Sequence, residues 1–327
     1  MVYRARDDRL ERDVAIKVIH PGIFVDDLTH KRFKREAVAL AKLNHPNIAT
    51  VHDFDSEGDR EFLVMELLGG QSLAEVLMDG PLPEAELVQY AMQLAEGLAA
   101  AHEQGIIHRD LKPGNLRVLP EGRLKILDFG LSKLLFAEGD AATASLPASM
   151  HMSGTLPYMA PEQLRSNEAD ARTDIYAAGV VLYEMATGMR PYRERGMLVV
   201  DSILNSHAPL PTTLNPHVSL ALEAVILRAM EREPEQRYQS ARELQADIEC
   251  LLTSRRPIAA RETSLRRTRK ALLWVALAFA VGLIAAGVWR AWPKLRPGGA
   301  ATGQRQVLLV GEFDNRTGDP VFDATLR

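Results

Sequence analysis

The sequence predicts an α+β fold, in which a small strand-rich part is followed by a larger helical part. Short β-branched and apolar runs in residues 1–68 predict strands together with one amphipathic helix. Helical spacing dominates from Ser72 onward, and a segment without charged residues follows at 271–289. A block of strands followed by a block of helices is typical of α+β proteins.

The strand-rich part covers residues 1–68. We expect strands at Val14–Ile19, Val51–Phe54 and Glu61–Glu66, because each short run contains valine, isoleucine or phenylalanine. Between the first two, Thr29–Leu43 places apolar residues at helical spacing on one face. These elements predict a small sheet and one helix.

The helical part covers residues 69–252, with its longest helix expected at Glu84–Gln104. In the whole chain 46% of residues are hydrophobic and 25% are charged, which is typical of a globular protein with a core. The net charge of −4 argues against a nucleic-acid partner. Cys250 is the single cysteine, which excludes an internal disulfide and a cysteine-based metal cluster and fits a reducing compartment.

Residues 253–270 form a basic linker ahead of the uncharged segment 271–289. That segment is close to the roughly 20 apolar residues that a membrane-spanning helix needs, and tryptophans lie near both of its ends. A buried core helix is the alternative, but core helices of this length usually carry a polar face. The sequence therefore predicts one transmembrane helix at 271–289.

Positive charge on both sides of this segment sets its expected orientation. The preceding flank carries more Lys and Arg than the following one, so residues 1–270 are expected in the cytoplasm. The basic linker either touches anionic lipid or is a topology signal only. Residues 290–327 are expected to begin an extracytoplasmic region that continues beyond Arg327, because a single predicted strand cannot bury a core. The charged residues counted are Arg255, Arg256, Arg261, Arg266, Arg267, Arg269 and Lys270 before the segment, and Arg290, Lys294, Arg296 and Arg305 after it.

The strongest functional signal is residues 108–115, which read HRDLKPGN and match the pattern of a phosphoryl-transfer catalytic loop. Three further motifs keep a matching order along the chain: VAIK at 14–17, DFG at 128–130 and APE at 160–162. One triplet alone means little, but the full set does not fit a plain structural loop. Over about Met1–Leu252 the sequence resembles protein kinases, specifically the membrane-bound serine/threonine kinases of bacteria.

This resemblance implies a two-lobed protein kinase fold, with a mostly-β N-lobe at 1–68 and a helical C-lobe at 69–252. It also implies transfer of the γ-phosphate of ATP, with Mg²⁺, to serine or threonine hydroxyls of protein substrates. Asp110 would lie near the attacking hydroxyl, Lys112 would place positive charge on the transferring phosphate, and Asn115 would bind Mg²⁺. A lysine at position 112 is typical of the serine/threonine branch.

Two further charged positions follow from the resemblance. Asp128 would hold the Mg²⁺ that bridges the nucleotide phosphates. Lys17 would contact the α- and β-phosphates and pair with a glutamate of the next helix, for which Glu36 is the candidate. Glu57 and Glu61 are poorer candidates because they fall in a turn and a strand, and Glu36 as an ordinary solvated acid stays open.

An adenine pocket is also implied. Adenine would hydrogen-bond to backbone groups of Glu66 and Leu68, with Met65 behind it. Ala15 and Val2 would line the same pocket. Adenine pockets are mostly apolar, so a plain buried strand fits the same residues.

The segment between the DFG and APE motifs resembles an activation segment. A phosphate on it would pair with Arg109 and order the segment. Thr155 instead resembles the residue that contacts Asp110 and Lys112 in this branch. The hydroxyl-bearing residues of the segment are Thr143, Ser145, Ser149, Ser153 and Thr155.

Two further residues resemble structural members of the family rather than catalytic ones. Asp174 resembles the buried aspartate that braces the catalytic loop. Arg237 resembles the arginine that pairs with the glutamate of the APE motif, Glu162. Removing one residue of a buried ion pair of this kind strongly destabilises the folded protein.

The sequence departs from the family pattern ahead of Lys17. Val2 fits the last valine of the glycine-rich loop, but the glycines that normally cover the phosphates are absent. A start upstream of Met1 is the favoured explanation, and weak ATP binding is the other. The alternative function is a pseudokinase-like membrane scaffold with weak or no ATP turnover.

The competing functions are separated by residues that are present. A pseudokinase usually lacks at least one of Lys17, Glu36, Asp110, Asn115 and Asp128, and all five occur here. A small-molecule kinase is disfavoured, because the APE motif and the preceding Gly154–Thr155 build a peptide-docking surface in the protein-kinase branch. Kinases of this kind often activate by dimerising, so the resemblance also allows a homodimer.

Overall fold

The computed structural model describes residues 1–19, 27–58, 60–129, 155–165, 169–194, 196–253 and 257. The chain divides into two compact units, Met1–Thr268 and Arg269–Arg327, and every described residue belongs to the first. The predicted span at 271–289 and the region 290–327 lie outside the described residues, as does most of the linker 253–270. Within the described ranges, no helix combines the length and the apolar character that a bilayer crossing requires.

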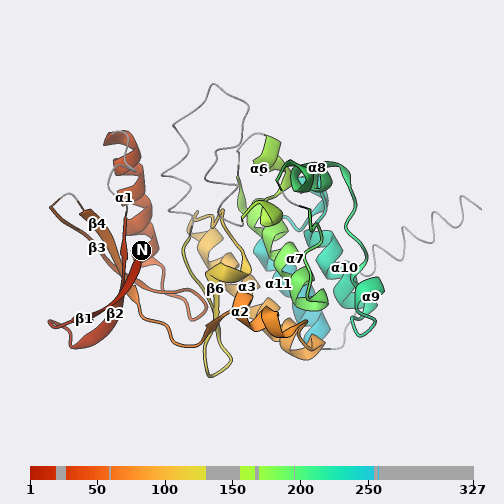
Figure 1. Ribbon diagram of the computed structural model, residues 1–327, viewed down its shortest axis with the longest axis horizontal. Helices are drawn as coiled ribbons and strands as arrows, with labels where there is room; N and C mark the ends of the chain where they lie inside the picture. The colour runs from red at the N-terminus through yellow and green to blue at the C-terminus, as the bar shows by residue number, and fades with distance from the viewer. Residues whose placement is uncertain are drawn as a thin grey trace, which may run out of the picture. The chain divides into compact units, whose positions relative to one another are not determined.

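The N-terminal sheet has four antiparallel strands in the order β1-β2-β4-β3 (Figure 1). They are β1 (Val2–Asp7), β2 (Arg12–Val18), β3 (Val51–Glu57) and β4 (Arg60–Glu66). The three predicted strands correspond to β2, β3 and β4, whereas β1 was not predicted. Its residues, VYRARD, alternate with charges and leave most of the strand exposed, so they carry little of the apolar signal that marks a strand.

Helix α1 (Asp27–Lys42) covers this sheet, as the spacing of its apolar residues predicts. Its buried face carries Phe33, Ala37 and Leu40. The Phe33 ring lies 5.4 Å from the ring of Phe54 in β3. This packing sets which residues of α1 face the other lobe.

The C-terminal part is built mainly from helices around α7 (Ala171–Thr187), whose residues are almost all buried (Figure 1). Gly179 allows α10 (Leu220–Ala229) to approach closely, because a Cβ there would lie 2.9 Å from the Cβ of Ala229. The predicted longest helix is α3 (Glu84–Glu103). The remaining helices are α2 (Leu73–Val76), α6 (Pro161–Arg165), α8 (Met197–Asn205), α9 (Pro211–Leu214), α10 (Leu220–Ala229) and α11 (Ala241–Leu252).

A second sheet of three short strands carries the loops of the candidate site. Its order is β5 (Gln71–Ser72), β6 (Leu116–Val118) and β7 (Leu124–Ile126). The catalytic-loop motif precedes β6 and ends in the 3₁₀ helix η2 (Pro113–Asn115), while the DFG motif follows β7. The two motifs therefore emerge from adjacent antiparallel strands.

The segment after α1 joins the two lobes through β7. The amide of Ile126 donates to the carbonyl of Asn47 at 2.8 Å, and the amide of Ala49 donates to the carbonyl of Ile126 at 2.9 Å. Helix α3 passes close by at Gly97, where a Cβ would lie 2.7 Å from the Cδ1 of Ile126. The N-lobe is thus hydrogen-bonded to the strand that leads to Asp128.

Candidate active site

The backbone of the catalytic loop is held by Asp174 of α7, which is 1% exposed. Its carboxylate accepts hydrogen bonds from the amides of His108 at 2.7 Å and Arg109 at 2.8 Å, and from Nε2 of His102 at 2.8 Å. Arg109 has a φ of 65°, a left-handed conformation that is unfavourable for a residue with a side chain. The bracing role expected for Asp174 is what holds this strained backbone.

Asp110, Lys112, Asn115 and Thr155 form one hydrogen-bonded cluster. The Nζ of Lys112 lies 3.0 Å from the Oδ2 of Asp110 and 2.8 Å from the Oγ1 of Thr155. The side-chain nitrogen Nδ2 of Asn115 donates to the backbone carbonyl of Asp110 at 2.8 Å and to the Oδ2 of Asp110 at 3.1 Å. The structure therefore brings together the three residues proposed as catalytic, and gives Thr155 the expected contact with Lys112.

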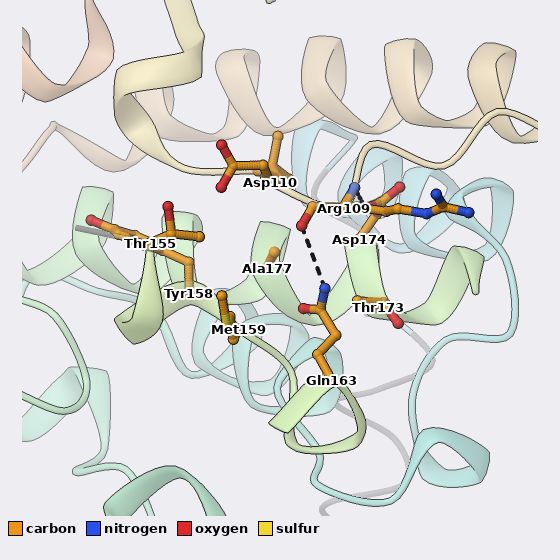
Figure 2. A pocket seen from close by; sticks show the side chains of 10 residues that line it. Arg109, Asp110, Thr155, Tyr158, Met159, Gln163, Thr173, Asp174 and Ala177 are labelled. Carbon is orange, nitrogen blue, oxygen red and sulfur yellow. Dashed lines mark hydrogen bonds between the residues drawn. The ribbon is translucent and has the colours of Figure 1, made fainter. Parts of the chain in front are cut away.

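Figure 2 shows this region around the catalytic loop. In this view the side chains of Asp110 and Thr155 lie to the left of Arg109, and Asp174 lies next to Arg109. Gln163 of α6 donates to the carbonyl of Arg109 at 3.4 Å, so both the amide and the carbonyl of this residue are held (Figure 2). The segment that ends in the APE motif is thereby attached to the catalytic loop.

His108 links the catalytic loop to the DFG motif. It is fully buried, its ring lies 4.7 Å from the ring of Phe129, and its Nε2 is 2.8 Å from the carbonyl of Leu127. Burial lowers the pKa of His108, which keeps the imidazole neutral. In the neutral ring Nε2 donates to Leu127 while Nδ1 accepts from the amide of Asp110 at 3.2 Å.

The structure corrects the expected pairing of Lys17 with Glu36. Lys17 of β2 pairs with Asp128, with 2.8 Å between Nζ and Oδ1, while Glu36 of α1 lies 3.9 Å from the guanidinium of Arg109. Asp128 has a left-handed backbone conformation with a φ of 53°. Its carboxylate forms the ion pair with Lys17. Helix α1 instead turns Glu36 toward the catalytic loop.

Glu36 is therefore a partly buried acid rather than an ordinary solvated one. Burial raises the pKa of Glu36, and the nearby charges of Arg109 and Arg35 offset this only in part. Its side chain is 35% exposed, and the Nε of Arg109 has no hydrogen-bond partner among the described residues. The pair is an ion pair without a direct hydrogen bond.

The residues expected around adenine lie on neighbouring strands. Val2 is opposite Lys17 in the β1–β2 register, and Ala15 is opposite Met65 in the β2–β4 register. Ala15 and Met65 are buried, whereas Val2 is 59% exposed. Glu66 ends β4, and Leu68 follows it in the connection to the C-lobe.

The predicted pair of Glu162 and Arg237 is present and bidentate. Both nitrogen–oxygen distances are 2.7 Å, and the Arg237 side chain is fully buried. Burial would raise the pKa of Glu162, but hydrogen bonds and charge from Arg237 outweigh this and lower it. The end of the activation segment is thus anchored to the loop before α11.

The family described as "Protein kinase domain" matches residues 1–247. This chain belongs to the protein kinase family.

Several bacterial kinases are similar to it in sequence. Serine/threonine-protein kinase PknB of Mycobacterium leprae is 36% identical over 253 residues, which cover 76% of this chain and 40% of that protein. A probable serine/threonine-protein kinase of Clostridium perfringens is 36% identical over 250 residues, which cover 76% of this chain and 36% of that protein. The chain thus spans less than half the length of these relatives.

A similar fold occurs among solved structures. The kinase domain of Mycobacterium tuberculosis PknI matches with a TM-score of 0.59 and 25% identity, covering 76% of this chain and 89% of that one. The two-lobed kinase fold expected from the sequence is therefore confirmed for the described part of this kinase.

Sequence reasoning missed three residues of the kinase site. His102 donates to Asp174, Gln163 holds Arg109, and Lys125 contacts Glu66. None belongs to the HRD, DFG or APE triplets, and each contacts a residue far along the chain. The one available signal was the position of Lys125, a charged residue inside the apolar strand before DFG. The candidate phosphosites Thr143, Ser145, Ser149 and Ser153, together with Gly130, lie outside the described residues.

Proposed function

We propose that this chain is an ATP-dependent protein kinase that phosphorylates serine and threonine residues of other proteins. The observation that carries this proposal is the position of Lys112, which contacts both Asp110 and Thr155. The lysine brings positive charge to the carboxylate that would face the attacking hydroxyl, and the threonine connects both to the peptide-docking segment. The names of similar bacterial proteins, serine/threonine-protein kinases, support the same substrate class.

The donor atoms present fit a magnesium–nucleotide complex. The side-chain nitrogen of Asn115 donates hydrogen bonds to Asp110, so the side-chain oxygen of Asn115 is left to bind a cation. Asp128 adds a carboxylate oxygen, and one or two protein oxygens together with phosphate oxygens are what Mg²⁺ prefers. Bound Mg·ATP would supply the transferable phosphoryl group and neutralise its charge.

The residues of this chain would then act in turn. Lys17 would exchange Asp128 for the α- and β-phosphates, which frees the Asp128 carboxylate for the metal. Asp110 would orient the substrate hydroxyl and accept its proton, and Lys112 would stabilise charge on the transferring phosphoryl group. Ala15 and Met65 would enclose adenine in an apolar slot, with hydrogen bonds from the connection after β4.

Phosphate transfer tests this function directly. The full 327-residue chain is incubated with labelled Mg·ATP and a generic basic protein, followed by phosphoamino-acid analysis. We expect label on serine and threonine for the wild type and its loss in Asp110→Asn. Absence of transfer by the wild type, or label that persists in Asp110→Asn, contradicts the proposal.

A non-catalytic scaffold is the second candidate. The direct Lys17–Asp128 pair favours it, because each charge needed for phosphate and metal is neutralised by the other. This candidate predicts nucleotide binding that is weak or undetectable by calorimetry, with no transfer. Measurable transfer that depends on Asp110 excludes it.

The membrane anchor remains a proposal from the sequence. It is supported by the uncharged stretch at 271–289 and by the excess of Lys and Arg before it. Alkaline carbonate extraction of bacterial membranes should leave the full chain in the pellet, and release it when 271–289 are deleted. Added protease should degrade the kinase domain in inverted vesicles and spare it in intact spheroplasts. Extraction of the full chain into the soluble fraction contradicts the anchor.

A further inference from the structure

One buried lysine has no part in the proposed chemistry. Lys125 lies in β7, three residues before Asp128, and 8% of its side chain is exposed. A buried ammonium group requires a charged partner. Its partner is Glu66, the last residue of β4, with Nζ 2.7 Å from Oε2 and 3.0 Å from Oε1.

Glu66 is held from a second direction by the segment that enters β3. Its Oε2 accepts from the amide of Thr50 at 3.2 Å, and its own amide donates to the carbonyl of Thr50 at 2.9 Å. Side chain and backbone of Glu66 are therefore fixed at the same time. Few rotations remain for the residue at which the N-lobe sheet ends.

The support behind this pair is itself rigid. Asn47 donates from its side-chain amide to the carbonyl of Leu124 at 2.9 Å, and Gln93 of α3 accepts from both Asn47 and the amide of Leu124. Together with the Ile126 hydrogen bonds described above, these contacts make β7 and the segment before β3 one unit. Lys125 connects that unit to the end of β4.

We propose that Lys125 is a positioning residue for adenine. It acts through Glu66: by fixing the carboxylate it fixes the backbone of Glu66 and Leu68, which would accept from the 6-amino group of adenine and donate to its ring nitrogen. This rests on the ATP-dependent function proposed above. A site arranged to hydrogen-bond an amino group discriminates against a ligand that lacks it, and that discrimination requires the acceptor to be held still.

A purely structural ion pair would behave differently. Removing one partner of a buried pair is destabilising, while replacing both by apolar residues of similar volume restores much of the stability. If Lys125 only stabilised the fold, nucleotide preference would return together with stability. A positioning residue loses the preference in both variants.

The experiment compares two nucleotides on the full 327-residue chain by titration calorimetry. Mg·ATP is one, and the magnesium complex of purine riboside triphosphate, which lacks the 6-amino group, is the other. We expect Lys125→Met to weaken Mg·ATP about tenfold, equivalent to about 1.4 kcal/mol, and to leave the second nucleotide nearly unchanged. In transfer assays KM for ATP should rise more than kcat falls.

Three further variants complete the design. Lys125→Met/Glu66→Met should regain melting temperature but not the preference for ATP. Glu66→Gln can keep the Thr50 contact but removes the charge and turns one of the two oxygens that Lys125 contacts into an NH2 donor, so it carries the same expectation as Lys125→Met if that variant does not fold. Arg242→Met removes an ion pair with Glu103 in which both side chains are more than half exposed, and should change neither nucleotide.

The outcomes separate two failures. An unchanged preference in folded Lys125→Met or Glu66→Gln, or a double variant that regains preference with stability, overturns this inference alone. A wild-type chain that binds neither nucleotide overturns the proposed function, and this inference with it.

Discussion

A single buried carboxylate holds the catalytic loop in a strained conformation. Replacing Asp174 by Asn removes the charge and turns one of the two oxygens that accept from the His108 and Arg109 amides into an NH2 donor. We expect the free energy of unfolding to fall by about 3 kcal/mol, since hydrogen bonds to a charged group contribute about 1.5–3 kcal/mol and a buried amide would be left unpaired. Urea unfolding measures this. Asp201→Asn, an exposed acid bonded to Asn205, is the matched control, and an equal loss there contradicts the prediction.

Glu162 gives the stability of the domain a dependence on pH. Its pKa in the folded protein lies below the ordinary value of 4.5, because Arg237 outweighs the effect of burial. The unfolded chain therefore binds the proton first as pH falls, so the stabilisation is complete above about pH 4.5 and is lost as pH drops through the folded pKa. We expect Glu162→Gln to flatten the decline in melting temperature below pH 4.5. Glu103→Gln, at an exposed pair, should keep the wild-type slope.

Contacts inside a contiguous motif were predictable, and partners across the fold were less so. The HRDLKPGN spacing alone brings Asp110, Lys112 and Asn115 into one loop, and the structure joins them by hydrogen bonds. The partner of Lys17 depends instead on how α1 is oriented over the sheet and on the backbone of Asp128. No local pattern encodes these, which is why the expected Glu36 pair was wrong for this conformation.

Among the elements, α1 is the one whose position decides which charges meet. It places Glu36 beside Arg109, the residue expected to bind an activation-segment phosphate, so carboxylate and phosphate would compete for one guanidinium. We expect the autophosphorylated kinase to be more active than the same protein after phosphatase treatment. In Arg109→Ala that difference should disappear, measured as initial rates on one substrate.

Two observations would contradict this competition. One is a phosphatase effect that persists at full size in Arg109→Ala. The other is the absence of any phosphate within residues 131–159 of an active preparation, determined by peptide mapping. Arg165→Ala, at the end of α6, serves as the control because it keeps Arg109. This variant should retain the difference in rate between the autophosphorylated and the phosphatase-treated protein.

Element boundaries followed the apolar pattern where burial is one-sided. Helices α1 and α3 were found because their apolar residues recur at helical spacing, and strands β2 to β4 because each contains a short run with valine, isoleucine or phenylalanine. Strand β1 was missed because it is a largely exposed edge strand held by backbone pairing to β2. Backbone pairing does not require apolar side chains, so the hydrophobic pattern of the sequence does not reveal such a strand.

For the whole molecule, the order of motifs predicted the two-lobed architecture, because each motif belongs to a known place in the kinase fold. The order of the motifs does not predict the conformational state in which the two lobes contact each other. Lys17 comes from β2 of the N-lobe and Asp128 from the DFG motif that follows β7, and in this structure they form an ion pair. The same contact that joins the lobes also occupies the groups that phosphate and metal would need.

This contact makes a prediction about how ligands stabilise the kinase. Mg²⁺ alone should bind weakly, since Asp128 is paired with Lys17, and ATP without metal should also bind weakly. When both ligands are present, ATP binds Lys17 and so frees Asp128 for Mg²⁺, while Mg²⁺ binds Asp128 and so frees Lys17 for ATP. The shift in melting temperature with both ligands should therefore exceed the sum of the two separate shifts. At a concentration of 100 times Kd the joint stabilisation would be about 2.7 kcal/mol.

Lys17→Met separates this coupling from simple binding. Without the lysine the Asp128 carboxylate is free, so Mg²⁺ alone should raise the melting temperature of Lys17→Met more than that of the wild type, while the gain from adding ATP should shrink. Asp128→Asn should show no shift that depends on Mg²⁺. Thermal melts with Mg²⁺, with ATP plus chelator, and with both give the comparison. Strictly additive shifts in the wild type, or no greater response of Lys17→Met to Mg²⁺ alone, would mean that the Lys17–Asp128 contact does not control ligand binding.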